Sequence, residues 1–172
     1  IEGVFYKKDI QGTYWNLSSH LNNLTKEGNV LFPRGKKPEF LIGRILEMCS
    51  QPGDLVLDSF LGSGTTAAVA QKMGRKYIGI ELGNHAYTHC YPRLKMVTDG
   101  TDQGGISKAQ NWKGGSGFKF YELAQSLLKE DKFGNLVINK EYNADMLAAA
   151  MAKQEGYTYQ PDATLYWKQG QS

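Results

Sequence analysis

The chain has 172 residues, 41% of them hydrophobic and 22% charged, which is the composition of an ordinary globular domain. Its formal net charge of +3 permits contact with nucleic acid without requiring it, and no apolar run approaches the roughly 20 residues that cross a bilayer. Two cysteines, Cys49 and Cys90, are too few for a disulfide framework, so we expect both to be reduced and buried in the core.

Residues 1–35 are expected to form an irregular connecting arm. Their middle part, GTYWNLSSHLNNLTKEGN, is rich in Asn, Ser, Gly and Thr, the residues of turns and caps. Tyr14 and Trp15 are suited to stacking on a base, although anchoring a loop to the core is the commoner role of such side chains. His20 is expected at the surface or at a helix cap. Because the first residue is Ile rather than Met, we also expect the chain to be part of a longer protein.

A helix is predicted to begin at Pro38, because proline suits the first helical position. The apolar side chains that follow recur on one helical face. They are Leu41, Ile42, Ile45, Leu46 and Cys49. The turn-forming run QPGD, residues 51–54, ends this helix. Lys37 stands at the helix entry, where a solvated lysine is the ordinary interpretation.

The stretch from Leu55 to Glu81 carries the strongest pattern in the chain. A strand pattern is followed by a glycine-rich turn, a helix of small residues that Gly74 ends, and a second strand pattern. Each strand pattern ends in an acid. In chain order, these elements are residues 55–57, Asp58, residues 62–66, residues 67–73, residues 77–80 and Glu81. This order predicts half of a nucleotide-binding α/β unit.

The ligand of this unit is expected to carry a ribose and a small anionic group. Gly62 and Gly64 permit a sharp turn and close approach of the backbone to a ligand. The helix N-terminus that follows supplies N–H donors and a partial positive charge, which suit a carboxylate or a phosphate. Glu81 stands 23 residues after Asp58, close to the spacing of about 20 residues at which an acid accepts the hydroxyls of a ribose.

Three classes of ligand compete for this turn. A P-loop nucleotide is weakly supported, because Thr65 and Thr66 rather than a lysine follow Gly64. The run GSGTTA fits the pattern G-x-G-x-x-A, which leaves a nicotinamide or flavin dinucleotide open. Asp58 argues against a pyrophosphate, which its carboxylate would crowd, and favours a ligand with an ammonium group. S-adenosylmethionine has a ribose, a carboxylate and an ammonium, and it fits both acids.

Two blocks of this sequence resemble a known family. The run DSFLGSGTT, residues 58–66, closely resembles the D-P-F-x-G-S-G-T-T cofactor motif of the amino-group DNA methyltransferases, with Ser59 in place of the proline. The run KKPEFLIGRI, residues 36–45, is similar to their K-P-x-x-L-x-x-R-I segment. In the circularly permuted, beta-type group these two blocks are adjacent in this order. The resemblance covers about residues 30 to 98.

This resemblance implies a fold class, a cofactor and a set of site residues. The fold is an α/β, partial Rossmann-like methyltransferase sheet with a small α+β C-terminal extension, divided into a connecting arm at 1–35, a cofactor half-domain at 36–98 and an extension at 99–172. The cofactor is S-adenosyl-L-methionine, and neither a catalytic residue nor a metal ligand is expected in this chain. The implied cofactor-binding residues are Lys37, Pro38, Asp58, Phe60, Gly62, Ser63, Gly64, Thr65, Thr66 and Glu81.

Some of these residues have a second interpretation. Phe60 is either a core plug beneath the turn or an aromatic contact to the cofactor, and both roles are compatible. Thr65 and Thr66 suit helix capping as well as holding the methionine carboxylate. After Glu81, a helix is predicted from the cap Asn84, which Pro92 should kink or restart.

The histidines of this helix, His85 and His89, have the spacing of a metal-binding pair, i and i+4. We expect no Cys, Asp or Glu to complete a ligand set with this pair, so a metal site is not predicted here.

The last third of the chain is predicted to be a separate extension. Residues 98–117 read as a glycine-rich connector, and residues 118–123 alternate as a strand. A second strand is expected at 136–138, a helix capped by Asn143 at 144–154, and a final strand at 164–168. The run GGSGFKFYEL resembles the G-G-x-G-F-x-x-x-x-L segment of modification subunits of type III restriction–modification systems.

One motif of the amino-group methyltransferases is missing from the sequence. Their D/N/S-P-P-Y/F/W tetrapeptide holds the flipped target base, but the five prolines here include no adjacent pair. We therefore expect this chain to be an inactive fragment of a DNA methyltransferase that modifies adenine N6. Cytosine N4 is the alternative target, and an oxidoreductase fragment and a non-catalytic interaction module are the rivals from other classes.

The family resemblance also implies partners and a location. The partners are DNA, through the full-length protein, and a restriction subunit, and the location is the prokaryotic cytoplasm. A second copy of the chain is a further expected partner, because an open sheet exposes an edge that can pair.

Overall fold

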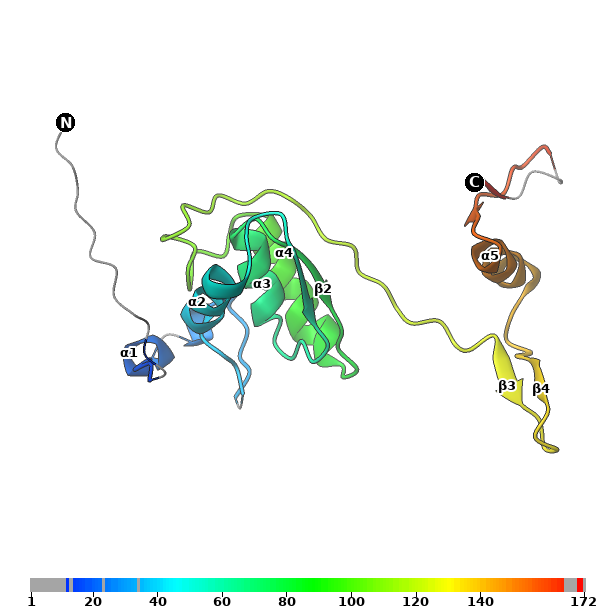
Figure 1. Ribbon diagram of the computed structural model, residues 1–172, viewed down its shortest axis with the longest axis horizontal. Helices are drawn as coiled ribbons and strands as arrows, with labels where there is room; N and C mark the ends of the chain where they lie inside the picture. The colour runs from blue at the N-terminus through cyan, green and yellow to red at the C-terminus, as the bar shows by residue number, and fades with distance from the viewer. Residues whose placement is uncertain (1–11, 13, 23, 34, 166–169, 172) are drawn as a thin grey trace. The chain divides into compact units, whose positions relative to one another are not determined.

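The computed structural model describes residues 12, 14–22, 24–33, 35–165 and 170–171, and these mix short helices and strands (Figure 1). The chain divides into two compact units, residues 1–120 and residues 121–172. The expected mixed α/β class is confirmed at this level. Among the described residues, no helix is long and apolar enough to cross a membrane.

The first unit is built around a parallel strand–helix–strand unit. Strands β1 and β2 pair in parallel, with Leu55 opposite Lys76 and Asp58 opposite Gly79, and α3 connects them. The described elements of this unit, in chain order, are α1 (Ser18–Leu21), η1 (Leu24–Lys26), α2 (Glu39–Cys49), β1 (Leu55–Asp58), α3 (Thr65–Lys72), β2 (Lys76–Gly79), the π-helix η2 (Ala86–Cys90) and α4 (Tyr91–Thr98).

Helix α3 forms the centre of the core. Its small side chains Ala67, Ala68 and Ala70 are buried, so neighbouring helices approach it closely. One cluster packs α3 against α2 and a second packs it against α4, and each reaches the sheet through Tyr77. The predicted alternation of strand and small-residue helix thus places α3 between two other helices and the sheet.

The β1–β2 sheet has one covered face and one exposed face. Val56 and Tyr77 are paired neighbours that pack against the core. Leu57 and Ile78, also paired, lie on the opposite face and keep 64% and 50% of their surface exposed. The described residues of this unit therefore form a layer on one face of the sheet only.

Local sequence signals fix several boundaries, with two corrections. Pro38 lies one position before α2, as its N-cap, rather than at the first helical position. Pro92 stands in the first turn of α4 and restarts the helix after η2, as predicted, because its missing N–H removes no helical hydrogen bond there.

Cys90 is buried, but Cys49 is exposed, so the prediction that both cysteines are buried is wrong for Cys49. The face of α2 that carries Cys49 near its end does not reach the core there.

Residues 99–117 are not the open connector that their glycine content indicated. Asp102, Ile106 and Ser107 are buried, and the Trp112 Nε1 donates to Val97 O at 2.8 Å. The first unit extends to Phe120 as a result. Polar and glycine-rich composition predicted mobility, but here Gly100 and Gly104 allow close backbone packing, because a Cβ at these positions would clash with the backbone at Lys113 and Lys26.

The predicted strand at 118–123 is also wrong. Phe118 and Phe120 alternate as expected, but they pack edge-to-face on the ring of Tyr91, at centroid distances of 5.7 and 5.5 Å. Phe120 also meets Tyr87 at 5.2 Å. The period-two pattern therefore matches a row of aromatic rings on η2 and α4 rather than a neighbouring strand.

The second unit contains a hairpin and a helix. Strands β3 (Leu128–Glu130) and β4 (Leu136–Ile138) pair antiparallel, and α5 (Ala144–Gln154) follows, then β5 (Thr158–Tyr159) and β6 (Gly170–Gln171). The strand at 136–138 and the helix at 144–154 are confirmed, and Asn143 caps α5 by accepting from Met146 N at 2.9 Å. The strand predicted at 164–168 is absent at Thr164 and Leu165, and its remainder lies outside the described residues.

The arm is described from residue 12 onward, apart from three gaps. The guanidinium carbon of Arg44 lies 4.5 Å from the ring centroid of Trp15. The rings of His20 and Phe40 are stacked, with their centroids 4.0 Å apart. Both contacts anchor the arm to α2. Tyr14, by contrast, is exposed.

Candidate cofactor-binding site

The glycine turn between β1 and α3 has a backbone that only glycine adopts without strain. Gly62 and Gly64 have φ angles of 59° and 78°. Gly64 also lies so close to η2 that a Cβ there would be 3.3 Å from the Cα of Cys90. The turn is closed by the Gly64 N–H, which donates to Leu61 O at 2.9 Å. It leads directly into α3, whose first-turn amides have no intrahelical partner.

The structure brings the two predicted acids to the same edge of the sheet. Parallel pairing of β1 and β2 places Asp58 and Glu81 at the carboxyl ends of neighbouring strands. Asp58 Oδ1 accepts from Phe60 N at 3.0 Å. Glu81 Oε2 accepts from Gly62 N at 2.7 Å, so this acid is tied to the glycine turn itself.

Glu81 is held as a carboxylate. Partial burial acts to raise its pKa, but hydrogen bonds from the amides of Gly83 and Gly62 and the nearby His85 outweigh burial and lower it. The His85 Nε2 lies 3.1 Å from Glu81 Oε1. An anionic side chain at this position can accept hydrogen bonds from ligand hydroxyls, as the sequence predicted for a ribose.

The remaining predicted residues differ in accessibility. Phe60 keeps 89% of its surface exposed, so its interpretation as a core plug is wrong, and its role as an aromatic contact to the cofactor stays a prediction. A plug would need the turn to fold over it, whereas Leu61 takes that place and packs on Gly79. Lys37 is exposed next to the buried Pro38. Thr66 is half-buried at the start of α3.

Ser63 and Thr65 face the protein interior. Both residues are buried, and their hydroxyl oxygens lie 3.2 Å apart. The Nη1 of Arg93 donates to Thr65 Oγ1 at 2.8 Å and to Ser63 O at 3.3 Å. The turn is thus supported from the inside by the guanidinium of a residue on α4.

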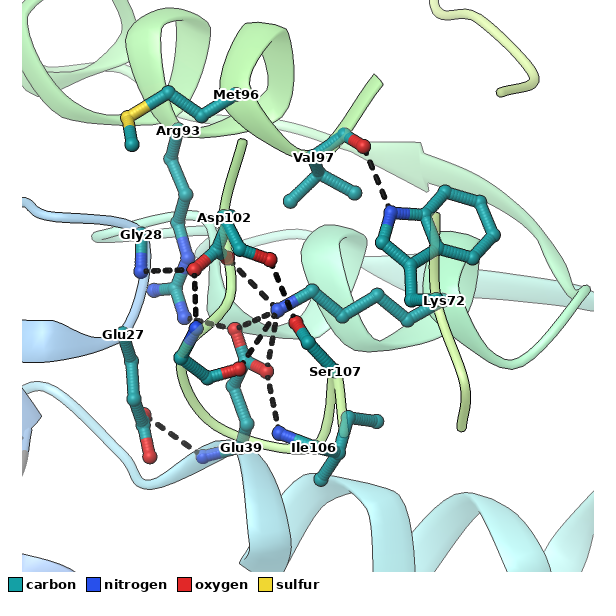
Figure 2. Close-up of polar contacts among 12 residues, drawn as sticks. Glu27, Gly28, Glu39, Lys72, Arg93, Met96, Val97, Asp102, Ile106 and Ser107 are labelled. Atoms are coloured by element: carbon teal, nitrogen blue, oxygen red, sulfur yellow. Dashed lines mark hydrogen bonds and ion pairs between the residues drawn. The ribbon is translucent and has the colours of Figure 1, made fainter. Parts of the chain in front are cut away.

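Arg93 belongs to a buried group of four charged residues, which we call the ion cluster: Glu39, Lys72, Arg93 and Asp102 (Figure 2). Lys72 Nζ donates to both oxygens of Glu39, at 3.0 and 2.8 Å, and to Asp102 Oδ2 at 2.7 Å. Arg93 Nη2 donates to Glu39 Oε1 at 2.8 Å. Two acids thus face two cations, and the ion cluster connects α2, α3, α4 and the segment after α4.

Backbone amides complete the ion cluster. Asp102 Oδ1 accepts from Gly28 N at 3.1 Å and from Gly104 N at 3.0 Å, and Glu39 Oε2 accepts from Ile106 N at 3.1 Å. These bonds satisfy the carboxylates that burial would otherwise leave unpaired. Within the described residues, the Arg93 Nε is a buried nitrogen without a hydrogen-bond partner.

Two further titratable groups lie beside the ion cluster. Glu27 Oε2 accepts from Glu39 N at 3.0 Å, and Lys36 Nζ donates to Glu27 O at 2.6 Å and Val30 O at 2.8 Å. Burial raises the pKa of Glu27 to about 7, although the amide of Glu39 acts in the opposite direction. Burial, together with the charge of Arg93, lowers the pKa of Lys36 to about 8. Glu27 and Lys36, which hold the backbone that precedes α2, therefore both have pKa values near neutral pH.

Comparison with known proteins identifies the family of this chain. A model of the DNA methylase family matches residues 5–91, which is just over half of the chain. The chain belongs to the DNA methylase family. The prediction of an amino-group DNA methyltransferase relative is thereby confirmed, and the oxidoreductase alternative is excluded.

Two known proteins are similar in sequence to this chain. The chain is 54% identical over 121 residues to a probable type III restriction–modification enzyme HindVI Mod subunit of Haemophilus influenzae, covering 70% of this chain and 16% of that protein. It is 45% identical over 73 residues to the type II methyltransferase M1.MboII of Moraxella bovis, covering 41% of this chain and 28% of that protein. The matched part therefore spans less than a third of either relative.

Proposed function

We propose that this chain is the cofactor-binding part of a DNA methyltransferase that transfers a methyl group from S-adenosyl-L-methionine to adenine N6. The observation that carries this proposal is the glycine turn, flanked by Asp58 and Glu81 at one edge of two parallel strands, in a member of the DNA methylase family. The cofactor supplies a methyl group activated by its sulfonium. The residues of this chain bind and orient that cofactor.

The donor set of the turn fits the cofactor group by group. The open amides at the start of α3 suit the methionine carboxylate, and Asp58 suits the ammonium. Glu81, kept anionic, suits the ribose hydroxyls. The exposed ring of Phe60 offers a stacking surface for the adenine. The proposed site comprises Lys37, Pro38, Asp58, Phe60, Gly62, Ser63, Gly64, Thr65, Thr66 and Glu81.

The proposal extends to the fold of the whole protein. We take β1 and β2 as two strands of a larger, Rossmann-like parallel sheet, because strands of parallel sheets are normally covered on both faces. The exposed side chains Leu57 and Ile78 support this view, since they leave one face of the pair uncovered. The cover would come from residues outside this sequence.

The target base is proposed from the relatives. The sequence has no adjacent prolines and hence no tetrapeptide for a flipped base, so the base pocket would be supplied outside this sequence. The similarity to a Mod subunit favours adenine N6 over cytosine N4 as the target. It also suggests DNA and a restriction subunit as partners, in a prokaryotic cytoplasm. A second copy of the chain is a further proposed partner, because the sheet is open. Mass spectrometry of nucleosides from DNA methylated by the longer protein separates N6-methyladenine from N4-methylcytosine.

Calorimetric titration tests the cofactor assignment. S-adenosylmethionine should bind the chain, whereas a nicotinamide dinucleotide should not. Asp58→Ala should weaken binding by about tenfold, the loss of one charge-assisted hydrogen bond. Asp99→Ala, at an exposed acid after α4, is the matched control and should bind as the wild type does. Binding of the dinucleotide in preference to S-adenosylmethionine would contradict the proposal, and if neither binds, the same titration is made with the longer protein.

A further inference from the structure

Arg93 connects the glycine turn to the ion cluster through opposite ends of one guanidinium. Its Nη1 contacts Thr65 Oγ1 and Ser63 O, and its Nη2 contacts Glu39 Oε1. The side chain is fully buried, so these contacts are made without competition from water. A planar guanidinium fixes the angle between its donors, and a lysine at this position would lack that second arm.

We propose that Arg93 is a positioning residue for the cofactor turn. It holds Ser63 and Thr65 against the interior and thereby fixes the turn in the conformation that presents the amides of α3 and the anchored Glu81 to the ligand. This inference rests on the cofactor proposed above, and it assigns a role in binding to a residue that lies behind the turn and does not touch the cofactor. Glu39 orients Arg93, because its carboxylate accepts the Nη2 hydrogen bond.

Lys72 provides the contrast that separates positioning from stability. Lys72 lies in the same ion cluster, and it pairs with Glu39 and Asp102. Among the described residues, its Nζ donates to these carboxylates and to Gly104 O, and none of these acceptors belongs to the glycine turn. Removal of either cation leaves buried acids undercompensated and should lower the melting temperature. Only removal of Arg93 should also loosen the turn.

The hydroxyl of Thr65 and the backbone carbonyl oxygen of Ser63 accept the hydrogen bonds that Arg93 donates to the turn. Thr65 Oγ1 accepts from the guanidinium and is also hydrogen-bonded to the Ser63 hydroxyl. Charge-assisted hydrogen bonds of this kind are roughly twice as strong as neutral ones. The Thr65 hydroxyl is therefore the point on the turn through which Arg93 acts, and its removal should reproduce the effect of changing Arg93 while the ion cluster stays complete.

Hydrogen–deuterium exchange of the turn in the ligand-free chain measures positioning directly. The reporters are the amides of Leu61, Gly62 and Gly64, each of which is hydrogen-bonded in the structure. In Arg93→Lys and in Thr65→Val these amides should exchange at least tenfold faster than in the wild type. Thr65→Ser keeps the hydroxyl and should restore slow exchange, and Lys72→Met should lower the melting temperature while turn exchange stays within threefold.

Cofactor titration of the same variants completes the test. Arg93→Lys and Thr65→Val should each weaken S-adenosylmethionine binding at least tenfold, and the double variant should bind no more weakly than the worse single variant, because both changes remove the Arg93–Thr65 hydrogen bond. Wild-type turn exchange in both single variants overturns the positioning role. If Arg93→Lys fails to fold, Thr65→Val decides alone. A wild-type chain that binds no S-adenosylmethionine counts against the proposed function, while the exchange data still decide the role of Arg93.

Discussion

Glu39 and Arg93 are fully buried charged residues, the first in α2 at its start and the second in the first turn of α4. A buried charge is costly unless it is paired and hydrogen-bonded. Here each finds its partner in a different helix, at 2.8 Å, and Lys72 compensates the second oxygen of Glu39. Loss of one partner from such a group typically costs about 3–5 kcal/mol of folding free energy. Arg93, which supports the glycine turn, is thus also expected to contribute to folding stability.

Replacement of Glu81 by alanine should weaken S-adenosylmethionine binding by about 1–3 kcal/mol, the range for charge-assisted hydrogen bonds. The variant removes the proposed ribose acceptor and also the anchor of the Gly62 amide. Calorimetry measures the loss. Glu81→Gln keeps an acceptor oxygen without the charge, so its affinity for S-adenosylmethionine should lie between those of the wild type and Glu81→Ala. Unchanged affinity in Glu81→Ala would contradict the assignment of this acid to the cofactor.

Glu27 should make folding stability depend on pH. Burial raises its pKa from 4.5 to about 7, so between these values the folded chain binds more protons than the unfolded chain. The contribution of Glu27 is therefore fully present below pH 4.5 and is lost as pH rises through 7. Glu27→Gln removes this dependence, and the stability of the variant relative to the wild type should rise by about 2–3 kcal/mol across that range.

Urea denaturation at several pH values measures the Glu27 effect as the difference between variant and wild type. Glu47→Gln, at an exposed position of α2, is the control and should show no such difference. A constant difference between Glu27→Gln and the wild type from pH 4.5 to 7 would show that Glu27 is not held in its protonated form.

The two cysteines should differ sharply in reactivity. Cys90 is buried with its thiol donating to Gly62 O at 3.1 Å, and burial raises the pKa of this thiol to about 11. At pH 8 it is therefore protonated and poorly nucleophilic. Cys49 is exposed. Iodoacetamide followed by mass spectrometry should label Cys49 first in the folded chain, and equal labelling rates would contradict the packing of Cys90 beneath the turn.

At the scale of elements, close backbone approach determines how the helices meet. Helix α4 starts one residue after the π-helix η2, and this arrangement sets Cys90 against the glycine turn and Arg93 behind it. Turns with positive φ then bring loop backbone onto the same helix. At Gly28, with φ of 63°, a Cβ would stand 2.5 Å from the Arg93 Cγ.

The substitution Gly28→Ala should therefore destabilise the chain more than backbone strain alone. Gly53→Ala is the matched control, because Gly53 also has a positive φ, 93°, but has no atom within 4 Å of its Cβ position. The control should cost roughly 1–2 kcal/mol for the left-handed backbone, and Gly28→Ala roughly 3 kcal/mol or more. Urea denaturation measures both. Equal losses would mean that Arg93 moves aside at little cost.

At the scale of the whole molecule, the uncovered face of the β1–β2 sheet should promote self-association of the chain. Leu57 and Ile78 are neighbours on this face and are largely exposed. Double replacement by threonine keeps strand propensity but removes apolar surface. Light scattering should show wild-type mass increasing with concentration and the variant remaining monomeric.

The opposite face of the same sheet offers the control for self-association. Val56→Thr alters a side chain that packs into the core, so it should lower the melting temperature and leave association unchanged. A wild-type chain that stays monomeric at every concentration would contradict this prediction.

Much of this protein is encoded locally. The order strand, glycine turn, helix, strand follows from residues 55–81, because apolar runs and glycine positions act over a few residues. Asn143 likewise caps the start of α5, and Gly156, with a φ of 80°, lies just past its C-cap. The same local runs carry the family resemblance, which the match over residues 5–91 confirms.

Tertiary packing decided the rest. The partners of the ion cluster are 30 to 54 residues apart in sequence, and no periodicity relates Glu39 to Arg93 or Asp102 to Lys72. The aromatic alternation at Phe118 and Phe120 suited a strand equally well, and only the neighbouring Tyr91 determined that it packs on a helix. By itself, the sequence determined the elements and glycine turn of residues 55–81, the helix α5 and the family. Only the tertiary structure decided which charges are buried and what supports the turn, because the free energy of a buried charge depends on the groups that surround it in space.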